Sequence, residues 1–127
     1  TSFLVYTLDT NAIIYHLKKD PKAVAAFREI FSRNVPVYVS TITELELFSY
    51  PWIGQEEAEL IEIALKTVSI IPLDSRIARL AGSLRRVYRL KTSNAAIAAT
   101  ALSTGSILVT RNTKDFRAIP NIRLESI

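Results

Sequence analysis

The segment TLDTNAIIYHL, residues 7–17, most constrains what this chain can fold into. A short apolar run ends at Asp9, and Thr10 and Asn11 then begin a helix with apolar periodicity. In open α/β sheets, ligands bind in the crevice outside the carboxyl ends of the strands, where this pattern places a carboxylate. Asp, Thr and Asn are also common helix N-caps, so capping alone explains Asp9 unless similar residues recur at other strand ends.

Strand and helix signals alternate along the whole chain. β-branched and aromatic residues predict strands, and apolar residues at helical spacing predict helices. The expected helices cover residues 11–18, 21–31, 43–49, 56–66, 74–89 and 93–103, and the expected strands cover residues 3–8, 35–39, 68–71, 107–109 and 122–124. Such alternation with short loops predicts one α/β domain over residues 1–127, with a mainly parallel sheet.

The composition excludes several functional classes. The absence of cysteine excludes disulfides, thiolate nucleophiles and Cys-ligated zinc, and suits the cytoplasm, where we expect the protein. No apolar run approaches the roughly 18 residues of a membrane helix, so we expect no membrane association. The N-terminal run is interrupted by Asp9 and has no basic lead, unlike a signal peptide. A net charge of +4 favours polyanionic partners such as nucleic acid.

Polar residues recur where strands are expected to end or helices to begin. Glu46 lies one turn into a helix, Asn94 begins an Ala-rich helix, and Asn112 and Asp115 follow the strand ILVT. With Asp9, these positions can converge on one edge of a parallel sheet. Converging ionised carboxylates repel one another, and a divalent cation relieves that repulsion. Oxygen ligands without His or Cys suit Mg²⁺ or Mn²⁺ rather than zinc.

Each of these residues also has a purely structural interpretation. Thr43 and Glu46 fit a capping box, in which the glutamate only satisfies the N-terminus of its helix. Ser93 with Asn94 would serve as ordinary caps, and Asp115 could begin a helical turn. We assign Asp74 to helix capping alone, because no other candidate residue pairs with it.

Four segments together resemble the signature blocks of the PIN domain: TLDTNAIIYHL, STITELELF, KTSNAAIAATAL and ILVTRNTKDF. The nearest branch is that of the VapC-type ribonuclease toxins of toxin–antitoxin pairs. The resemblance covers essentially the whole chain, with the blocks in the right order. It implies a three-layer α/β/α sandwich with a sheet of four or five strands. It also implies a metal-dependent endoribonuclease.

The resemblance assigns the acidic residues of the family to positions in this chain. The first-strand acid falls on Asp9 and the glutamate of the second block on Glu46, because Glu44 would face roughly the opposite side of the helix. The third acid falls on Asn94. The fourth falls on Asn112, with Asp115 one turn later as the nearest carboxylate. The implied catalytic and metal-binding set therefore has two amides, so we expect weaker metal binding and lower activity.

The implied reaction is hydrolysis of RNA phosphodiester bonds by a metal-activated water. His16 is the only histidine, which excludes a two-histidine ribonuclease, and we interpret it as a surface or partly buried packing residue. The sequence has no glycine-rich phosphate-binding loop. We expect substrate contacts from the residues around the acidic positions: Thr10, Asn11, Thr110, Arg111 and Lys114. The arginines of residues 76–89 and Lys91 either add to that grip or form a solvated helix face.

The apolar segment that runs from Phe48 to Ile53 predicts a partner surface. In the resembled toxins this region helps to bind the antitoxin, and the domain forms a homodimer, so both partners are expected here. A side chain inserted by the antitoxin, typically Arg, would neutralise the acidic pocket. Packing of Trp52 into the core is the competing interpretation. Two alternatives to a toxin remain open: a PIN-like module that binds RNA or protein without cleavage, and a housekeeping RNA-processing nuclease.

Overall fold

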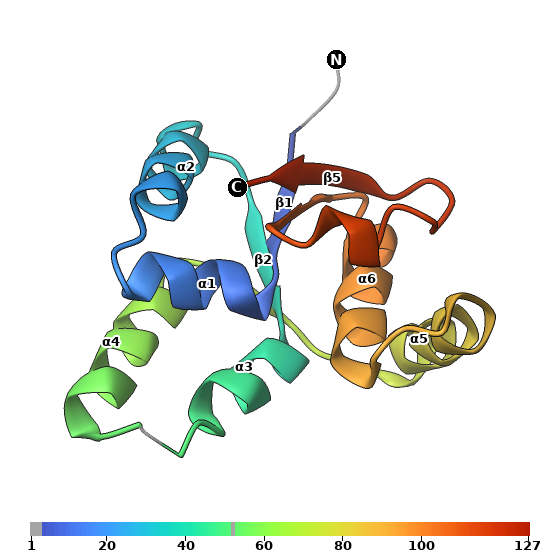
Figure 1. Ribbon diagram of the computed structural model, residues 1–127, viewed down its shortest axis with the longest axis horizontal. Helices are drawn as coiled ribbons and strands as arrows, with labels where there is room; N and C mark the ends of the chain where they lie inside the picture. The colour runs from blue at the N-terminus through green and yellow to red at the C-terminus, as the bar shows by residue number, and fades with distance from the viewer. Residues whose placement is uncertain (1–3, 52) are drawn as a thin grey trace.

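A computed structural model describes residues 4–51 and 53–127 of the chain. Five parallel strands form one sheet in the order β3-β2-β1-β4-β5, and helices cover both of its faces (Figure 1). The strands are β1 Tyr6–Leu8, β2 Val37–Ser40, β3 Ser69–Ile71, β4 Ile107–Thr110 and β5 Arg123–Ser126. The helices are α1 Thr10–Leu17, α2 Pro21–Ser32, α3 Thr41–Phe48, α4 Gln55–Leu65, α5 Ser75–Tyr88, α6 Thr92–Thr104 and the short 3₁₀ helix η1 Thr113–Asp115. The predicted α/β/α sandwich with a parallel sheet is confirmed.

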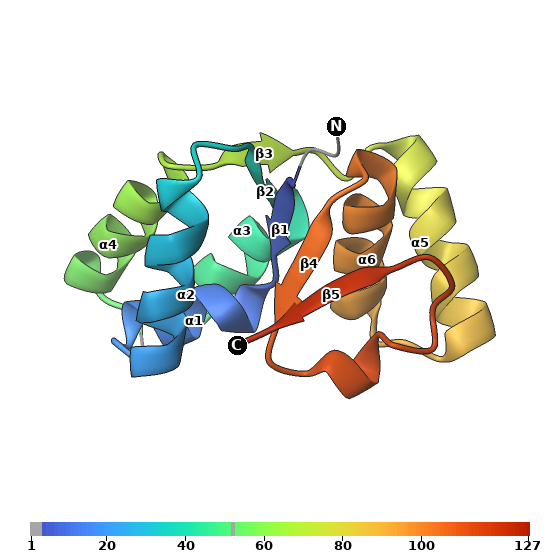
Figure 2. The ribbon, with the colours of Figure 1, turned by 90° about the horizontal axis from the view of Figure 1, so that it is seen from above.

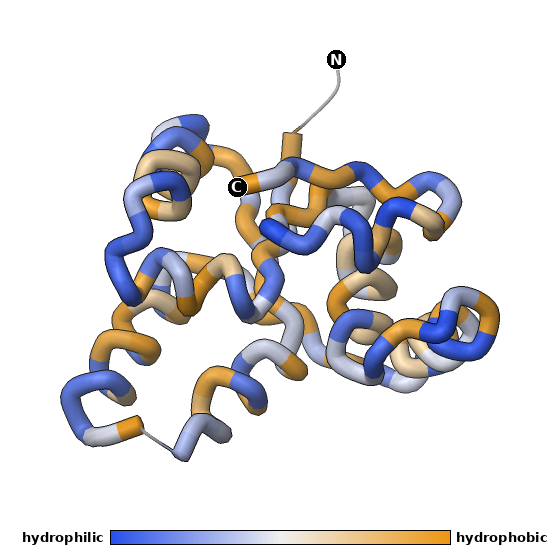
Figure 3. Tube along the Cα trace, viewed as in Figure 1, coloured by the Kyte–Doolittle hydropathy of each residue, from blue (hydrophilic) through white to orange (hydrophobic). Residues whose placement is uncertain are grey.

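Two apolar cores, one on each face of the sheet, hold the layers together (Figure 2). In β4, Val109 packs toward α1, α2 and α4, whereas its neighbour Leu108 packs toward α5 and α6. This alternation follows from the two-residue period of a strand, which sends successive side chains to opposite faces. Figure 3 shows that apolar residues are concentrated on the strands, whereas apolar and polar residues alternate along the helices. None of the helices in the described part of the chain is long and apolar enough to cross a membrane.

Short polar side chains fix where the helices begin. Asp20, Ser40 and Asp74 each accept a hydrogen bond from a backbone N–H in the first turn of the helix that follows. These bonds satisfy donors that the helix itself leaves unpaired. Capping by Asp74, whose carboxylate lies 2.9 Å from the Ile77 nitrogen, is confirmed. The C-cap of α6 is Gly105, which adopts a φ of +62°, a conformation that favours glycine.

Some predicted boundaries were wrong by a few residues. The helix expected to begin at Thr43 begins at Thr41 instead, because Ser40 at the end of β2 serves as its cap. The Ala-rich helix begins at Thr92, with Lys91 in the cap position, rather than at Ser93. The expected contribution of Phe3 to the first strand and the packing of Trp52 both lie outside the described residues.

The strand order places the polar strand ends beside one another. β1 has β2 and then β3 on one side and β4 and then β5 on the other, so the order in which strands join the sheet changes direction at β1, although all the strands stay parallel. Crevices at such switch points, outside the carboxyl ends of the strands, are the usual ligand sites of open α/β sheets. Asp9 directly follows β1, and Asn112 lies just beyond β4. The sheet therefore brings the first and last of the candidate positions to one crevice.

Loss of the α5 cap should lower stability without affecting the crevice. Asp74→Ala leaves the Ile77 N–H unpaired, and we expect the free energy of unfolding to fall by about 1 kcal/mol, as for other N-caps. Asp74→Asn keeps an acceptor in place and should stay close to the parent. Urea unfolding followed by circular dichroism measures both variants, and an equal loss for Asn and Ala would contradict the capping role.

Candidate functional site

A polar cleft of about 200 Å³ lies at the carboxyl edge of the sheet. It gathers residues that follow β1 and β4 and residues of α1, α3 and α6, which are distant in the sequence. The lining residues are Asp9, Thr10, Asn11, Glu46, Lys91, Ser93, Asn94, Ile97, Asn112, Asp115 and Phe116. All five acidic or amide positions predicted to bind metal therefore face the same cleft.

Asp9 is the most deeply placed carboxylate of the cleft, with 5% of its surface exposed. Its Oδ1 accepts the Ala12 N–H at 2.7 Å, so the residue caps α1 as well as lining the cleft. Burial raises the pKa of Asp9 above its ordinary value. The hydrogen bonds from Thr110 and Ala12 oppose this rise, and the nearby charge of Glu46 adds to it. Asp9 can therefore cap α1 and also serve in the cleft, because capping uses only part of its carboxylate.

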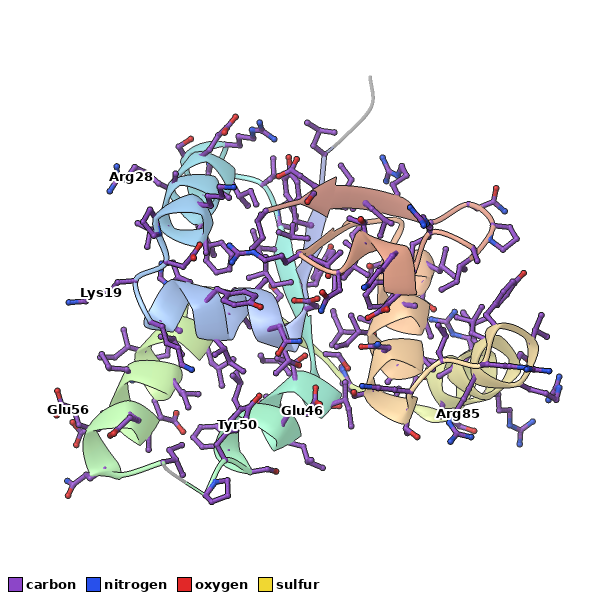
Figure 4. The ribbon with its side chains drawn as sticks, in the orientation of Figure 1. Lys19, Arg28, Glu46, Tyr50, Glu56 and Arg85 are labelled. Atoms are coloured by element: carbon purple, nitrogen blue, oxygen red, sulfur yellow. The ribbon has the colours of Figure 1, made fainter. Side chains whose placement is uncertain are left out.

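Glu46 is held by the first residue of α1 rather than by the N-terminus of its own helix. The Thr10 hydroxyl lies 2.6 Å from Oε1 of Glu46 and 3.0 Å from the hydroxyl of Thr43, which is buried. The capping-box interpretation of Thr43 and Glu46 is wrong, since Ser40 caps α3 and Glu46 points to α1. Figure 4 shows Glu46 on α3 between the N-terminal ends of α1 and α6. Glu44 does not line the cleft.

The first turn of α6 supplies an amide and a cation. Asn94 and Ser93 lie inside the helix, beyond its cap residue, and the cap makes no side-chain hydrogen bond. The capping interpretation of these two residues is therefore wrong, and both side chains contribute to the cleft lining instead. Lys91 also lines the cleft, although the sequence grouped it only with the arginines of the preceding helix. Its place just before the helix is the signal that could have identified it.

The segment after β4 brings both candidates for the fourth acidic position of the family to the cleft. Asn112 precedes the 3₁₀ turn η1 and Asp115 is its last residue, and both belong to the lining. Thr110, which is fully buried, accepts the Asn112 N–H at 3.0 Å and also hydrogen-bonds Asp9. Thr110 therefore links the segment after β4 to Asp9 at the end of β1. The 3₁₀ turn ends at Asp115 rather than beginning there.

Arg111 and Lys114 do not line the cleft, although both were expected to contact substrate there. The Arg111 guanidinium donates two hydrogen bonds to Asp20, at 2.6 and 3.3 Å, and one to the Ile127 carbonyl at 3.1 Å. It also lies 4.0 Å from the centre of the Tyr15 ring. The Arg111 hydrogen bond holds the pKa of Asp20 below its ordinary value. Arg111 thus joins β4, α1, α2 and the end of β5.

His16 lies outside the cleft and stacks on Phe27, with ring centres 4.6 Å apart. Burial lowers the pKa of His16, which favours the neutral ring. The interpretation of His16 as a partly buried packing residue agrees with this placement.

The family profile described as "PIN domain" matches residues 6–122. This chain belongs to the PIN domain family. It is 28% identical to Ribonuclease VapC2 of Rickettsia felis, covering 97% of this chain and 98% of that protein. It is also 28% identical to the tRNA(fMet)-specific endonuclease VapC of Salmonella typhimurium, covering 96% and 97%. A solved toxin–antitoxin complex from Klebsiella pneumoniae contains a chain with 31% identity and a TM-score of 0.79, covering 96% and 99%.

The donor set of this PIN domain suits a small oxygen-liganded cation. Within residues 4–51 and 53–127, no three acidic, histidine or cysteine side chains gather closely enough to bind a metal by themselves. Mg²⁺, however, is commonly bound by only one or two carboxylates together with waters and substrate phosphates. Asp9 and Glu46 supply two interacting carboxylates, and amide oxygens complete the lining. These residues fit Mg²⁺ or Mn²⁺ better than a cation that needs a complete protein cage.

Removing the buried charge should stabilise this PIN domain in the absence of cations. Because burial raises the pKa of Asp9, the folded state holds the proton more tightly than the unfolded chain, and stability falls as pH rises above about 3.8. Asp9→Asn keeps a capping acceptor and removes this cost. We expect its free energy of unfolding in EDTA to exceed that of the parent at pH 7.5. The difference should shrink as pH falls toward 3.8.

The matched control for this measurement is Asp115→Asn, which removes an equal charge from an exposed position of the same cleft. Its unfolding free energy should differ little from that of the parent at either pH. A destabilised Asp9→Asn at pH 7.5 would contradict the assignment of an unfavourably buried charge.

Proposed function

We propose that this PIN domain is a metal-dependent endoribonuclease, and the toxin of a VapBC-type toxin–antitoxin pair. The observation that carries the proposal is the convergence of Asp9, Glu46 and Asp115, with Asn94 and Asn112, on one polar cleft. The similarity of this chain to VapC ribonucleases, which covers nearly all of it, supports the same reaction.

The cleft residues would hold Mg²⁺ or Mn²⁺ through Asp9 and Glu46, with further oxygens from the amide positions and Asp115. When bound, such a cation polarises a phosphate and lowers the pKa of an attacking water. Thr10 orients the Glu46 carboxylate, and Thr110 with the Ala12 N–H orients that of Asp9. The repulsion between these two carboxylates is the energetic reason for them to accept a cation. Asn94 contributes an oxygen but no charge.

RNA is the substrate class, and a structured RNA is the form that we propose. Ribonuclease names recur among the relatives, and one of them is a tRNA(fMet)-specific endonuclease. Such substrates would place the protein in the cytoplasm. Lys91 supplies a positive charge within the cleft, where it can contact a phosphate beside the acidic side chains.

An antitoxin and a second copy of the chain are the proposed protein partners. Similarity to the chain from the Klebsiella toxin–antitoxin complex supports the first. α3 carries two exposed apolar side chains, Leu45 at 62% and Phe48 at 39% exposure. Phe48 begins the apolar segment noted in the sequence, and Leu45 lies one turn before it. Exposed apolar groups that lie close together are typical of interaction surfaces. We propose that this region contributes to the partner contacts.

The nuclease proposal is tested by incubating the purified protein with structured RNA and Mn²⁺. We expect defined cleavage products that EDTA abolishes. Asp9→Asn should lower the cleavage rate at least 100-fold, because it removes the most buried charge of the cleft while keeping the helix cap. Denaturing gels resolve the products, and unfolding curves verify that the variant is folded.

Three outcomes would contradict this proposal. Cleavage that persists in EDTA would exclude the metal mechanism. Full activity of Asp9→Asn would place the chemistry elsewhere. RNA binding by a folded protein that cleaves none of the RNAs offered, with either cation, would favour the non-catalytic module.

Restoring a carboxylate at position 94 should strengthen cation binding. Asn94→Asp adds a negative charge beside Asp9 and Glu46, so we expect a lower unfolding midpoint in EDTA and a larger rise in that midpoint with Mn²⁺ than for the parent. Cleavage should be at least as fast as that of the parent. Ser93→Asp adds the same charge one residue earlier and serves as the positional control. A loss of activity in Asn94→Asp alone would contradict our account of the charge in the cleft.

A further inference from the structure

The positive charge of this chain is concentrated in one continuous segment. Residues 75–114 contain eight Lys and Arg and no Asp or Glu. The rest of the chain has eight Lys and Arg against twelve Asp and Glu, so it is net negative. The modest overall charge of +4 therefore conceals a strongly basic segment that includes α5 and α6.

Five of these eight charges lie on α5 or at its C-cap, and all five are exposed. Ile77, Ala81 and Leu84 bury one side of this helix in the core that it shares with α6. Arg79 and Arg86 are two turns apart on the opposite side, about 10 Å along the axis, and both are exposed. Arg89 continues the row at the C-terminal end. We call these three residues, Arg79, Arg86 and Arg89, the α5 arginine face.

Nothing in the described fold neutralises this face. The ion pairs found among residues 4–51 and 53–127 are Arg33–Glu29 and Arg111–Asp20, and neither involves α5. No acidic side chain follows Asp74 on the helix. The helix macrodipole favours Arg86 in the last turn of α5 but gives no such support to Arg79 in the middle of the helix. Clustered like charges repel one another, so the face is suited to an external anion.

The α5 arginine face leads directly to the polar cleft. Arg89 ends the helix in a left-handed conformation, with a φ of +56°, and Lys91 lines the cleft two residues later. Figure 2 shows α5 running beside α6 at one end of the molecule, and the N-terminus of α6 supplies Asn94 to the cleft. A polyanion bound along α5 would therefore reach the cleft without crossing another element.

We propose that the α5 arginine face binds the phosphate backbone of RNA outside the cleavage point and guides the strand past Lys91 into the cleft. This inference rests on the proposed nuclease function. It assigns to α5 an affinity for long substrates that carries no sequence preference, because phosphate contacts position a nucleic acid without reading its bases.

An RNA backbone fits this face better than a protein partner does. Protein interfaces are enriched in Arg, but their cores also depend on apolar or aromatic anchors. The α5 arginine face has no such anchor, and Gly82 leaves open space between Arg79 and Arg86. Val87 is the large exposed apolar residue of α5, at 61% exposure, and it lies on a different side of the helix.

The experiment compares two double variants with equal charge loss. Arg79→Gln/Arg86→Gln removes the centre of the α5 arginine face, and Gln preserves helix propensity. Lys22→Gln/Arg28→Gln is the control, on exposed positions of α2. Figure 4 shows Arg28 at the opposite end of the molecule from Arg85 of α5. Each protein is tested with a hairpin RNA of about 30 nucleotides and with a four-nucleotide single strand.

For the α5 variant we expect kcat/KM on the hairpin to fall at least tenfold, with cleavage of the four-nucleotide strand unchanged. The slope of log affinity against log salt for the hairpin, measured by fluorescence anisotropy, should decrease by about two, one for each lost phosphate contact. The α2 variant should change each quantity less than twofold. Circular dichroism and urea unfolding establish that both variants are folded.

Equal effects of the two double variants, or an unchanged salt slope in the α5 variant, would overturn the proposal. So would an equal loss on long and short substrates, or a loss of antitoxin binding with hairpin affinity intact, since the face would then serve a protein. If the parent binds the hairpin but cleaves nothing, the nuclease function fails while the anisotropy comparison still tests the α5 arginine face.

Discussion

A carboxylate buried at the end of a strand needs hydrogen-bond donors, and Asp9 obtains them in a way that organises the rest of the site. Its Oδ1 accepts the Ala12 N–H, so α1 must begin immediately after β1 and run from that point. The buried hydroxyl of Thr110 binds the same carboxylate from the end of β4. One side chain thus fixes the start of a helix and the junction of two neighbouring strands. The raised pKa of Asp9 indicates that these bonds do not fully offset the cost of burial.

The second carboxylate is fixed through the first helix. Thr10 follows Asp9 directly, and its hydroxyl contacts both Glu46 and Thr43 on α3. Because a buried polar network loses stability when any member is left unpaired, these three side chains restrain the position of α3 relative to α1. The distance between the two acidic residues therefore depends on a short chain of hydrogen bonds. Backbone elements alone would leave the carboxylates free to move apart under their mutual repulsion.

The sequence predicted the parts of this arrangement that depend on local pattern. Strand–helix alternation determined the element order, and polar residues at strand ends predicted which positions share the cleft. The capping box of Thr43 and Glu46, the structural alternative that the sequence left open, is wrong, because Ser40 at the end of β2 caps α3 instead. The position of that strand end is not marked by the local motif. The orientation of the Arg111 side chain could not be predicted from the sequence either. Its partner Asp20 is 91 residues away in the sequence and also caps α2, so nothing local marks the pair.

The placement of Arg111 has a chemical consequence for the cleft. Arg111 stands between Thr110, which hydrogen-bonds Asp9, and Asn112, which lines the cleft, so a guanidinium turned into the cleft would meet its carboxylates. There it would form bidentate bonds to a carboxylate and compete with any cation for the same oxygens. Asp20 and the ring of Tyr15 hold Arg111 outside instead. No arginine of residues 75–114 is among the residues lining the described cleft, and Lys91 is the basic residue there. An unneutralised pair of carboxylates beside an open basic surface is the electrostatic arrangement that a metal ion and a phosphate backbone can occupy together.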